Sequence, residues 1–273
     1  MQGPGPESPP AASRLVALTR PVSPAFGRCE LTHLARQPID VEKAERQHAA
    51  YEAILGTLGC RIVRLPLAPD LPDSVFVEDA AVVVDEVAVI TRPGAPSRRG
   101  ETASVAAALT AHRPLVAIEA PAVLDGGDVL RLGLRLYVGL SARSDEAGVA
   151  QLAAHLAPHG YAVEGVALGK CLHLKTAVTE VADHLLLVNP AWIDRARFDG
   201  YEAVEVDPRE PFAANALRVR SGDTDSVVVA AAFPRTTERL AARGLDVRPV
   251  EVDEIAKAEG GVTCCSVLFV AAS

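Results

Sequence analysis

The sequence contains few aromatic residues, and its basic residues are outnumbered by acidic ones. Phe, Trp and Tyr make up 4% of the 273 residues, and 27 Lys and Arg stand against 35 Asp and Glu, for a formal net charge of −8 at pH 7. Nucleic-acid-binding surfaces use basic patches and aromatic stacking platforms, and anionic membranes attract basic segments. The composition therefore argues against nucleic-acid and membrane partners and is compatible with a small cationic ligand.

Long apolar runs are also missing. The longest one, Val227 to Phe233, is far shorter than the ~20 residues that a membrane-spanning helix needs. Residues 1–13 are rich in Pro, Gly and Ser but contain neither a basic cluster nor an apolar stretch, which is typical of a disordered tail and not of an export signal. We expect a soluble cytoplasmic protein with a disordered tail over residues 1–13 and a single folded domain over residues 14–273.

The cysteines do not suggest a disulfide framework. They lie at positions 29, 60, 171, 264 and 265, an odd number with no CxxC spacing and with two members adjacent, which fits a reducing compartment. The alternative to an enzyme is a structural zinc site formed by Cys171, His173, Cys264 and Cys265. Sulfur and nitrogen ligands suit zinc, but the spacing has no CxxC knuckle and leaves the acidic clusters without a role. The sequence also has no GxGxxG motif of the dinucleotide-binding type.

What the sequence does contain is a repeated unit of strand, turn, strand, helix and strand. The units are expected at residues 80–118, 129–166, 177–206 and 217–250, and the strands 14–19, 61–65 and 266–270 complete a fifth. Helices are expected from Asp40, which caps the first one, to its stop at Gly59, over 101–111 and 145–157, and from a cap near Thr236. Repeats of this length indicate a radial or stacked architecture.

Polar residues precede the first strand of every unit. They are Glu78 and Asp79, Asp125 to Asp128, His173, Asn215 and Cys264. In a ring of equivalent units, equivalent positions converge on one axis. The repeat therefore predicts that carboxylates, an imidazole, an amide and a thiol face one another across a central site.

The chemistry of these groups points to covalent catalysis on a cation. Cys264 follows two glycines at the mouth of a buried strand, and a thiol paired with an imidazole such as His173 is the minimal set for nucleophilic catalysis. Acidic residues around the Gly126-Gly127 turn suit a cation with several N–H donors, such as a guanidinium, although a plain Asp/Gly turn is the alternative. Arg98 and Arg143 are candidates for binding a carboxylate, with simple surface exposure as the alternative.

Several strings resemble the dimethylarginine dimethylaminohydrolase family of guanidine-modifying enzymes. In chain order they are LTHLARQPID, LPDSVFVEDAAVV, ITRPGAPSRRGE, LDGGDVL, VGLSAR, LHLKT, AAN and VTCCSVL, spread over residues 31 to 268. The resemblance implies an α/β fold, a five-bladed α/β propeller of ββαβ repeats with pseudo-fivefold symmetry and the active site on its central axis. This agrees with the repeat argument above.

The resemblance also assigns roles residue by residue. It makes Cys264 the nucleophile, His173 the general acid/base and Asp125 the carboxylate that orients them. The substrate-binding positions that it implies are Asp79 and the adjacent Glu78 for the guanidinium, Asp73 for the α-ammonium, Arg98 and Arg143 for the α-carboxylate, Leu31 in a lid, and the backbone of Ala258 at the entrance. Because carboxylates surround the thiol, we expect the thiol to be largely protonated until a cationic substrate binds.

The implied activity is the hydrolysis of Nω-methylated L-arginine to citrulline and an alkylamine through a covalent thiouronium on Cys264. Deimination of unmethylated arginine or of another guanidine is the alternative within the same chemistry. The resemblance implies no cofactor and no metal, a small cationic amino acid as substrate, and a monomer or homodimer. The folded domain is then a single catalytic domain.

Overall fold

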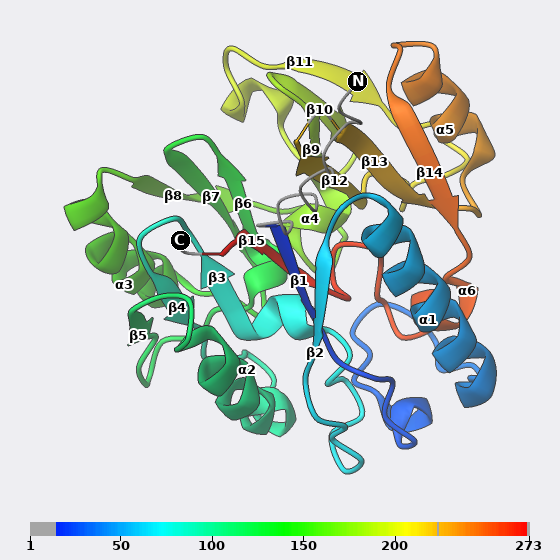
Figure 1. Cartoon of the computed structure of the whole chain (residues 1–273). Helices are drawn as coiled ribbons and strands as arrows, with labels where there is room; N and C mark the ends of the chain where they lie inside the picture. The colour runs from blue at the N-terminus through cyan, green and yellow to red at the C-terminus, as the bar shows by residue number, and fades with distance from the viewer. Residues whose placement is uncertain (1–14, 223, 272–273) are drawn as a thin grey trace, which may run out of the picture.

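Five small sheets are arranged as blades around one axis (Figure 1). The computed structural model describes residues 15–222 and 224–271, so the tail expected over residues 1–13 lies outside the described residues. Each of the five sheets contains three strands. In each, two strands pair antiparallel, and the middle one pairs with the third in parallel. The expected propeller of ββαβ repeats is confirmed.

The strand bounds follow the predicted units closely. The first blade contains β15 (Val267–Val270), β1 (Leu15–Thr19) and β2 (Arg61–Arg64), and the second contains β3 (Ala81–Val83), β4 (Ala88–Ile90) and β5 (Leu115–Ala117). The other three blades contain β6 (Val129–Leu132), β7 (Arg135–Leu140) and β8 (Ala162–Ala167); β9 (Val178–Ala182), β10 (Leu185–Val188) and β11 (Glu202–Glu205); and β12 (Ala216–Ser221), β13 (Thr224–Ala230) and β14 (Asp246–Val250). The first blade thus joins strands from both ends of the chain, with Leu15 opposite Val270.

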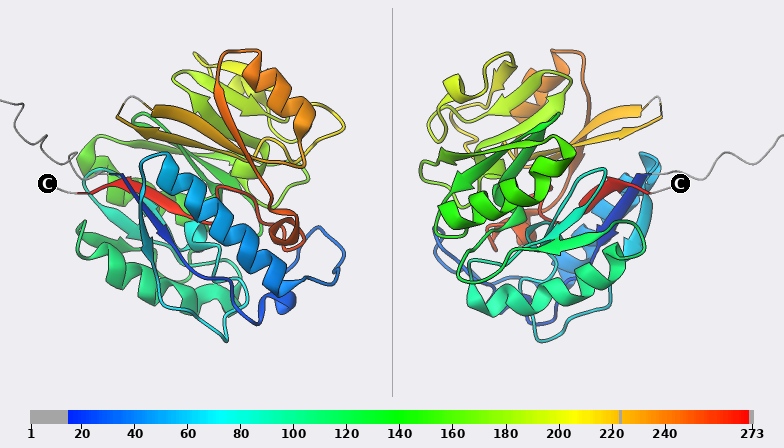
Figure 2. Two further views of the ribbon diagram at one scale, coloured as in Figure 1. Left: turned by 45° about the vertical axis from the view of Figure 1, so that its right-hand side comes forward. Right: turned by 90° about the vertical axis from the view of Figure 1, so that its left-hand side faces the viewer.

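Helices connect the parallel strands and lie on the outer side of the blades (Figure 2). They are α1 (Val41–Thr57), α2 (Thr102–Leu109), α3 (Glu146–Leu156) and α5 (Pro234–Ala241), with the 3₁₀ turn η6 (Arg195–Arg197) in the fourth blade. The Asp40 carboxylate accepts from the backbone N–H of Lys43, and Asp145 caps α3 in the same way through Gly148. The predicted starts of these two helices are therefore confirmed.

The prediction of one helix cap was wrong. We expected a cap near Thr236, but α5 begins at Pro234, and Phe233 precedes it without a side-chain cap. Proline is well suited to the first turn because its missing N–H is not needed there. The Thr236 hydroxyl instead accepts a hydrogen bond from the backbone N–H of Asp207 at 3.1 Å, so it ties the helix to the preceding blade.

The short elements occupy the inner and outer ends of the blades. They are η1 (Phe26–Arg28), η2 (Val77–Ala80), η3 (Pro96–Glu101), η4 (Gly126–Asp128), η5 (Ala157–His159), α4 (Leu174–Ala177) and α6 (Asp253–Ala256). In Figure 1, α4 lies near the middle of the ring. Among the residues that the structure describes, no helix is long and apolar enough to span a bilayer.

Apolar side chains fill the blades and their junctions, whereas polar ones occupy the axis. Five clusters of buried hydrophobic residues make up the core; the one around α1 contains Tyr51, Leu55, Phe26 and Phe76. The middle strand of each sheet is mostly buried and rich in Val, Leu and Ala, as expected where a sheet is packed on both sides, whereas the third strand is partly exposed. Packing of these buried strands fixes the positions of the strand ends that face the central axis.

Candidate active site

The thiol of Cys264 lies in a tight turn that leads into β15. The side chain is 8% exposed, and the backbone N–H of Gly261 points at its sulfur at 3.4 Å. Residues 260 and 261 have to be glycine, because a Cβ at Gly260 would overlap the ring of Phe76 and one at Gly261 would overlap the side chain of Asn215. The predicted glycine turn before the nucleophile is thus a close approach of backbone to two side chains.

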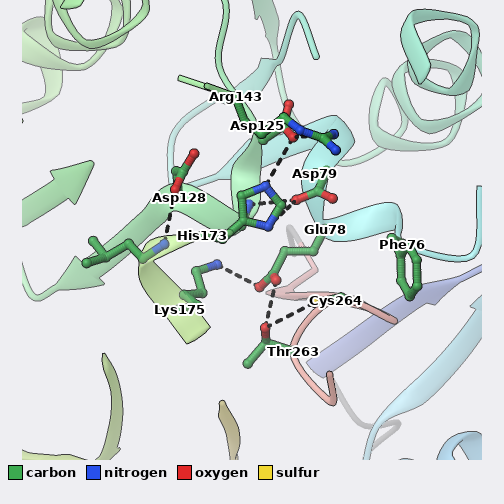
Figure 3. A network of polar contacts seen from close by, with 12 residues as sticks. Phe76, Glu78, Asp79, Asp125, Asp128, Arg143, His173, Lys175, Thr263 and Cys264 are labelled. Carbon is green, nitrogen blue, oxygen red and sulfur yellow. Dashed lines mark hydrogen bonds and ion pairs between the residues drawn. The ribbon is translucent and has the colours of Figure 1, made fainter. Parts of the chain in front are cut away.

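His173 and Asp125 form a buried pair (Figure 3), and His173 lines the same cavity as Cys264. His173 precedes α4, and its Nε2 lies 3.1 Å from Asp125 Oδ2, while its Nδ1 lies 3.9 Å from Asp79 Oδ1. Burial by itself would lower the pKa of His173, but the negative charges of Asp79, Asp128 and Asp125 outweigh it and raise the pKa to about 9. The imidazole is therefore protonated at neutral pH and able to donate a proton.

Asp79 is held from two sides. Its Oδ1 accepts from the backbone N–H of Gly127 at 2.9 Å, and its Oδ2 lies 2.6 Å from Nη1 of Arg98. Burial opposes ionisation, but His173 and Arg98 lower the pKa of Asp79 to about 2. The carboxylate is therefore negatively charged throughout the neutral range, as a guanidinium site requires.

Arg98 lies differently from the expectation. Its side chain is 3% exposed, and its nitrogens bind Asp79, both carboxylate oxygens of Glu101 and the carbonyl oxygens of Asp73 and Phe76. The guanidinium is thus taken up by protein groups. Binding of a substrate carboxylate by Arg98 stays a prediction, and it requires Nη1 to leave Asp79.

Asp128 supports the imidazole and was not assigned a role from the sequence. Its Oδ1 accepts from the backbone N–H of Leu174, and its Oδ2 accepts from the hydroxyls of Ser141 and Ser144 at 2.9 and 2.7 Å. Burial raises its pKa to about 6 despite the opposing effect of His173. Asp128 thereby fixes the start of α4, next to His173. The second acidic residue of the LDGGD string is the signal that could have found it.

Glu78 faces away from the imidazole, toward the other end of the axis. Its Oε1 binds Nζ of Lys175 at 2.6 Å, and its Oε2 accepts from the hydroxyl of Thr263 at 2.7 Å. Its backbone N–H donates to the carbonyl oxygen of Cys264 at 3.2 Å. Glu78 therefore ties η2 to α4 and to the thiol-bearing turn, and Figure 3 shows this bridge.

Asn215, the amide among the five axial positions, also contacts this turn. Its Oδ1 accepts from the backbone N–H of Thr263 at 3.1 Å, and its Nδ2 donates to the hydroxyl of the same residue at 3.0 Å. Together with Asp79, Asp125, His173 and Cys264, it lies where the ring prediction placed it. The convergence of the five blade starts on one axis is confirmed.

The loop of residues 29–37 contains the predicted lid residue Leu31 and contributes Glu30 to the cavity wall. We call this loop the lid, and its movement stays a prediction. The backbone N–H of Glu30 donates to both oxygens of Asp73, at 3.2 and 3.1 Å. Burial raises the pKa of Asp73, and the charge of Arg98 opposes this effect. Nη2 of Arg143 donates to the hydroxyl of Thr32 at 3.2 Å. Asp73 and Arg143, both predicted to bind the amino-acid end of a substrate, thus hold the lid in this structure.

Glu259 also fastens the lid and was missed by sequence reasoning. Its carboxylate accepts from three successive backbone N–H groups, those of Thr32 at 2.8 Å and of His33 and Leu34 at 2.5 Å each. Its own φ is 60°, a left-handed conformation that is uncommon for a residue with a side chain. Three consecutive amides around one carboxylate form an anion-binding nest. An acidic residue just before two glycines was a signal, but the lid partners lie more than two hundred positions away.

A small cavity at this point is lined by most of the predicted site residues. It has a volume of about 10 Å³ and is lined by Glu30, Asp73, Phe76, Asp79, Arg98, Arg143, Leu172, His173, Ala258, Glu259, Gly260 and Cys264. Three predicted residues do not line the cavity. Asp125 contacts His173, which does, and Glu78 lies behind Thr263. Leu31 is half-buried and packs against the core around α1. A cavity of this volume holds about one water molecule and has no room for an amino acid. That the lid opens to admit one stays a prediction.

The larger cavities lie outside this set of charged groups. One of about 320 Å³ lies beyond Gly260 and Gly261 and is lined mainly by apolar residues such as Phe212 and Phe233. Another, of about 260 Å³, lies at the end of the axis that carries Glu78 and Lys175. We assign the chemistry to the small cavity because the thiol, the imidazole and Asp79 meet there.

The predicted alternative of a zinc site with cysteine ligands is wrong. In the part of the chain that the structure describes, the group of potential ligands that lies close enough together consists of Asp79, Asp125 and His173 and contains no cysteine. The thiol of Cys171 points to the carbonyl oxygen of His173, and that of Cys265 points to the carbonyl oxygen of Gly261. The cysteines are thus directed to separate partners.

The environment of Cys264 favours the thiol over the thiolate. Burial and then the charges of Glu78 and Asp79 raise the pKa of Cys264 to about 12, against small opposing effects of Gly261 and Thr263. This agrees with the expectation that the empty site holds a protonated thiol. A further positive charge close to the sulfur would favour the thiolate, which is the nucleophilic form.

Comparisons with known proteins match this geometry. A family model described as arginine deiminase matches residues 66–215. The N(G),N(G)-dimethylarginine dimethylaminohydrolase of Streptomyces coelicolor is 41% identical over 253 residues, which cover 92% of this chain and 95% of that protein. The protein of the same name from Pseudomonas aeruginosa is 37% identical over 240 residues, which cover 87% of this chain and 92% of that protein.

A solved structure extends the similarity to three dimensions. The Pseudomonas aeruginosa enzyme, as a cysteine-to-serine mutant in complex with citrulline, superimposes with a TM-score of 0.88 at 35% sequence identity. The match covers 93% of this chain and 98% of that one. The similarity therefore includes all five blades and the axis that they share.

Proposed function

The chain belongs to the dimethylarginine dimethylaminohydrolase family, and from this premise we propose that it hydrolyses Nω-methylated L-arginine to citrulline and an alkylamine. It is a hydrolase that acts on a C–N bond of a guanidino group. The observation that carries the proposal is the meeting of a thiol, a protonated imidazole and an ionised carboxylate in one small cavity. A cationic amino acid supplies the positive charge that this cavity lacks beside the sulfur.

The proposed reaction starts when the guanidinium binds to Asp79, displacing the Nη1 contact of Arg98. The added positive charge lowers the pKa of Cys264, whose proton leaves to solvent because His173 already carries its own. The thiolate attacks the guanidinium carbon and forms a tetrahedral intermediate. Such substrate-assisted activation explains why the resting thiol can be kept protonated.

His173 then acts twice. It donates its proton to the methylated nitrogen, the C–N bond breaks, and the alkylamine leaves a thiouronium on Cys264. The neutral imidazole next takes a proton from water as the oxygen adds to the same carbon. The C–S bond then breaks and the hydroxyl of the intermediate gives its proton to the departing sulfur, so citrulline and the thiol of Cys264 are released. Asp125 accepts from Nε2 of His173 and stabilises the imidazolium in both steps.

The remaining site residues bind the amino-acid end in this proposal. Asp73 receives the α-ammonium group and Arg143 the α-carboxylate, with Arg98 as a second donor once it has left Asp79. In the resting structure, Asp73 and Arg143 hold the lid instead, so substrate binding and lid position are linked. Leu31 lies in the lid, and the backbone of Ala258 lines the entrance.

We also propose that residues 14–273 act as one catalytic domain, because the site takes side chains from every blade. One assay tests the activity: citrulline release from dimethylarginine, monomethylarginine, arginine and agmatine, measured side by side. We expect the two methylated substrates to be turned over and agmatine to be poor. Faster release from unmethylated arginine would overturn the proposal in favour of a deiminase.

A further inference from the structure

The thiol-bearing turn is held from its rear by helix α1, in a way that the sequence did not suggest. On the axial side, Asn215 and Glu78 bind Thr263, as described above. On the opposite side, the turn packs against α1, which carries a stripe of buried polar side chains at Gln47, His48, Tyr51 and Glu52. A helix that packs against a core normally presents apolar residues there. The polar stripe therefore needs a partner, and part of it faces the turn.

Tyr51 makes the direct contacts. Its side chain is completely buried, and its hydroxyl donates to the carbonyl oxygen of Val262 at 2.8 Å. The same oxygen lies 2.7 Å from Oγ of Ser266, and because a phenol has one proton, the serine hydroxyl is the donor in this second bond. Val262 and Ser266 are the residues on either side of the turn that carries Cys264.

One hydroxyl thus joins the two ends of the turn, and Cys264 lies between them. The contact of the sulfur with the N–H of Gly261 depends on the same short segment, since Gly261 directly precedes Val262. The next turn of α1 toward its start secures the approach to this segment, because the side chain of Gln47 accepts from the backbone N–H of Glu254 in α6. Helix α1 therefore fixes the backbone on both sides of the nucleophile.

We propose that Tyr51 is a positioning residue for the reaction: its hydroxyl holds the Val262–Ser266 turn so that the sulfur of Cys264 faces the substrate carbon. The inference rests on the proposed function for its kinetic consequence and on the geometry alone for its effect on the thiol. Displacement of a reacting atom by about 1 Å can cost roughly a hundredfold in rate. A loosened turn therefore affects the chemical step more than binding of the amino acid, whose partners lie on other segments.

The test compares Tyr51→Phe with Tyr161→Phe. Both changes remove one hydroxyl and keep the ring, and Tyr161 is also largely buried, but its hydroxyl donates to Glu86 in a different part of the molecule. For Tyr51→Phe we expect kcat to fall about ten- to a hundredfold while KM changes less than about threefold. Tyr161→Phe should have the kcat and KM of the unmodified protein. An unchanged kcat in Tyr51→Phe, or a loss seen in KM alone, would overturn the proposal.

A second measurement does not depend on turnover. The rate at which iodoacetamide alkylates Cys264, followed by peptide mass spectrometry, should rise at least about threefold in Tyr51→Phe, because a loosened turn exposes the sulfur. Slower catalysis together with faster alkylation indicates a misplaced thiol, whereas general destabilisation would raise alkylation of the other buried cysteines as well. Equal rates in the unmodified protein and in Tyr51→Phe would contradict the proposal even if no guanidine were hydrolysed.

Ser266→Ala provides a milder variant if Tyr51→Phe does not fold. It removes the bond to Ser266 and leaves the bond between Tyr51 and the carbonyl oxygen of Val262 in place. We expect a smaller fall in kcat, about threefold to tenfold, again without a matching change in KM. A kcat equal to that of the unmodified protein would show that closing the turn through Tyr51 does not matter.

Discussion

The floor and the lid of the cavity enclose the same space but are held in different ways. The floor consists of Asp79, His173 and Cys264, supported by Asp125 and Asn215, and each of the five is largely buried and contacts a residue of another blade. The lid, residues 29–37, is mostly exposed, and its backbone amides are held by the carboxylates of Asp73 and Glu259 at the rim.

From this difference we expect the floor to stay fixed and the lid to move. Floor contacts are shielded from water and depend on the register of strands, so they persist as long as the blades are folded. Lid contacts lie at the exposed rim and are partly solvated, so we expect the lid to open at a lower cost in free energy than the floor. A cavity of about 10 Å³ has no room for an amino acid, so in the proposed function the lid opens to admit the substrate while the floor stays in place.

The largest expected effect comes from breaking the floor at its nucleophile. Cys264→Ser should abolish citrulline release while dimethylarginine still binds, because a serine hydroxyl in this acidic pocket is a poor nucleophile at neutral pH. Cys265→Ser should keep most of the activity, because the thiol of Cys265 points to the carbonyl oxygen of Gly261. Turnover and isothermal binding of both variants provide the measurement. A covalent adduct on Cys265 in the trapped reaction would contradict the assignment.

The floor also sets the pH dependence of the thiol. Because burial and nearby carboxylates raise the pKa of Cys264 to about 12, its alkylation by iodoacetamide in the ligand-free protein should rise about tenfold per pH unit from pH 7 to 9. A cationic amidine in the cavity should lower the apparent pKa. The pH profile of inactivation, with and without the amidine, measures both effects. A plateau already reached below pH 7 would mean that His173 holds a preformed thiolate.

Arg143 connects floor and lid, so its loss should affect both. Arg143→Ala removes the contact of Nη1 with Asp125 at 3.7 Å and the donor to Thr32, and in the proposed function also the partner of the substrate carboxylate. A charge-assisted contact is worth roughly 1.5 to 3 kcal/mol, so kcat/KM should fall about ten- to a hundredfold. Arg131→Ala, which removes a surface ion pair with Asp85, is the matched control and should have no such effect. Efficient turnover of agmatine by the unmodified protein would refute this recognition scheme.

A smaller effect is expected when the lid alone is weakened. Glu259→Gln keeps the size of the side chain but replaces a charge-assisted acceptor by a neutral one for three amides, so KM should rise about threefold to tenfold with little change in kcat. Trypsin should also cleave faster after Arg36. Glu251→Gln, an exposed change nearby, serves as control. Kinetics and cleavage equal to those of the control would show that Glu259 does not hold the lid.

The repeat made much of the floor predictable from the sequence. Strand periodicity and turn residues defined the units, and equal spacing of polar residues relative to the strands indicated that Asp79, His173 and Cys264 meet. Such an inference needs no knowledge of individual contacts, because a ring of similar units brings equivalent positions together. The helix start at Asp40 was predictable for a different reason, because helix capping depends only on residues close together in the sequence.

Contacts between positions far apart in the sequence were not predictable. Tyr51 lies on the buried face that the spacing predicts for its helix, and nothing near it indicates a hydroxyl partner 211 positions later. Glu259 acts through a left-handed backbone conformation and a loop at the other end of the sequence. Arg98 was read as a ligand-binding side chain because its string resembled the family, whereas its resting partners, Asp79 and Glu101, follow from packing of η3 against the axis.

The pairing of β1 with β15 has a consequence for how the molecule is made. Leu15 and Val270 are neighbours in one sheet, so the ring closes through a contact of very high sequence separation, and such contacts form late and slowly during folding. Synthesis from the ribosome can complete the second to fifth blades before the last strand emerges. Because Cys264 directly precedes that strand, its thiol reaches the axis only at ring closure. We therefore expect a nascent chain to have no positioned nucleophile until β15 has paired with β1.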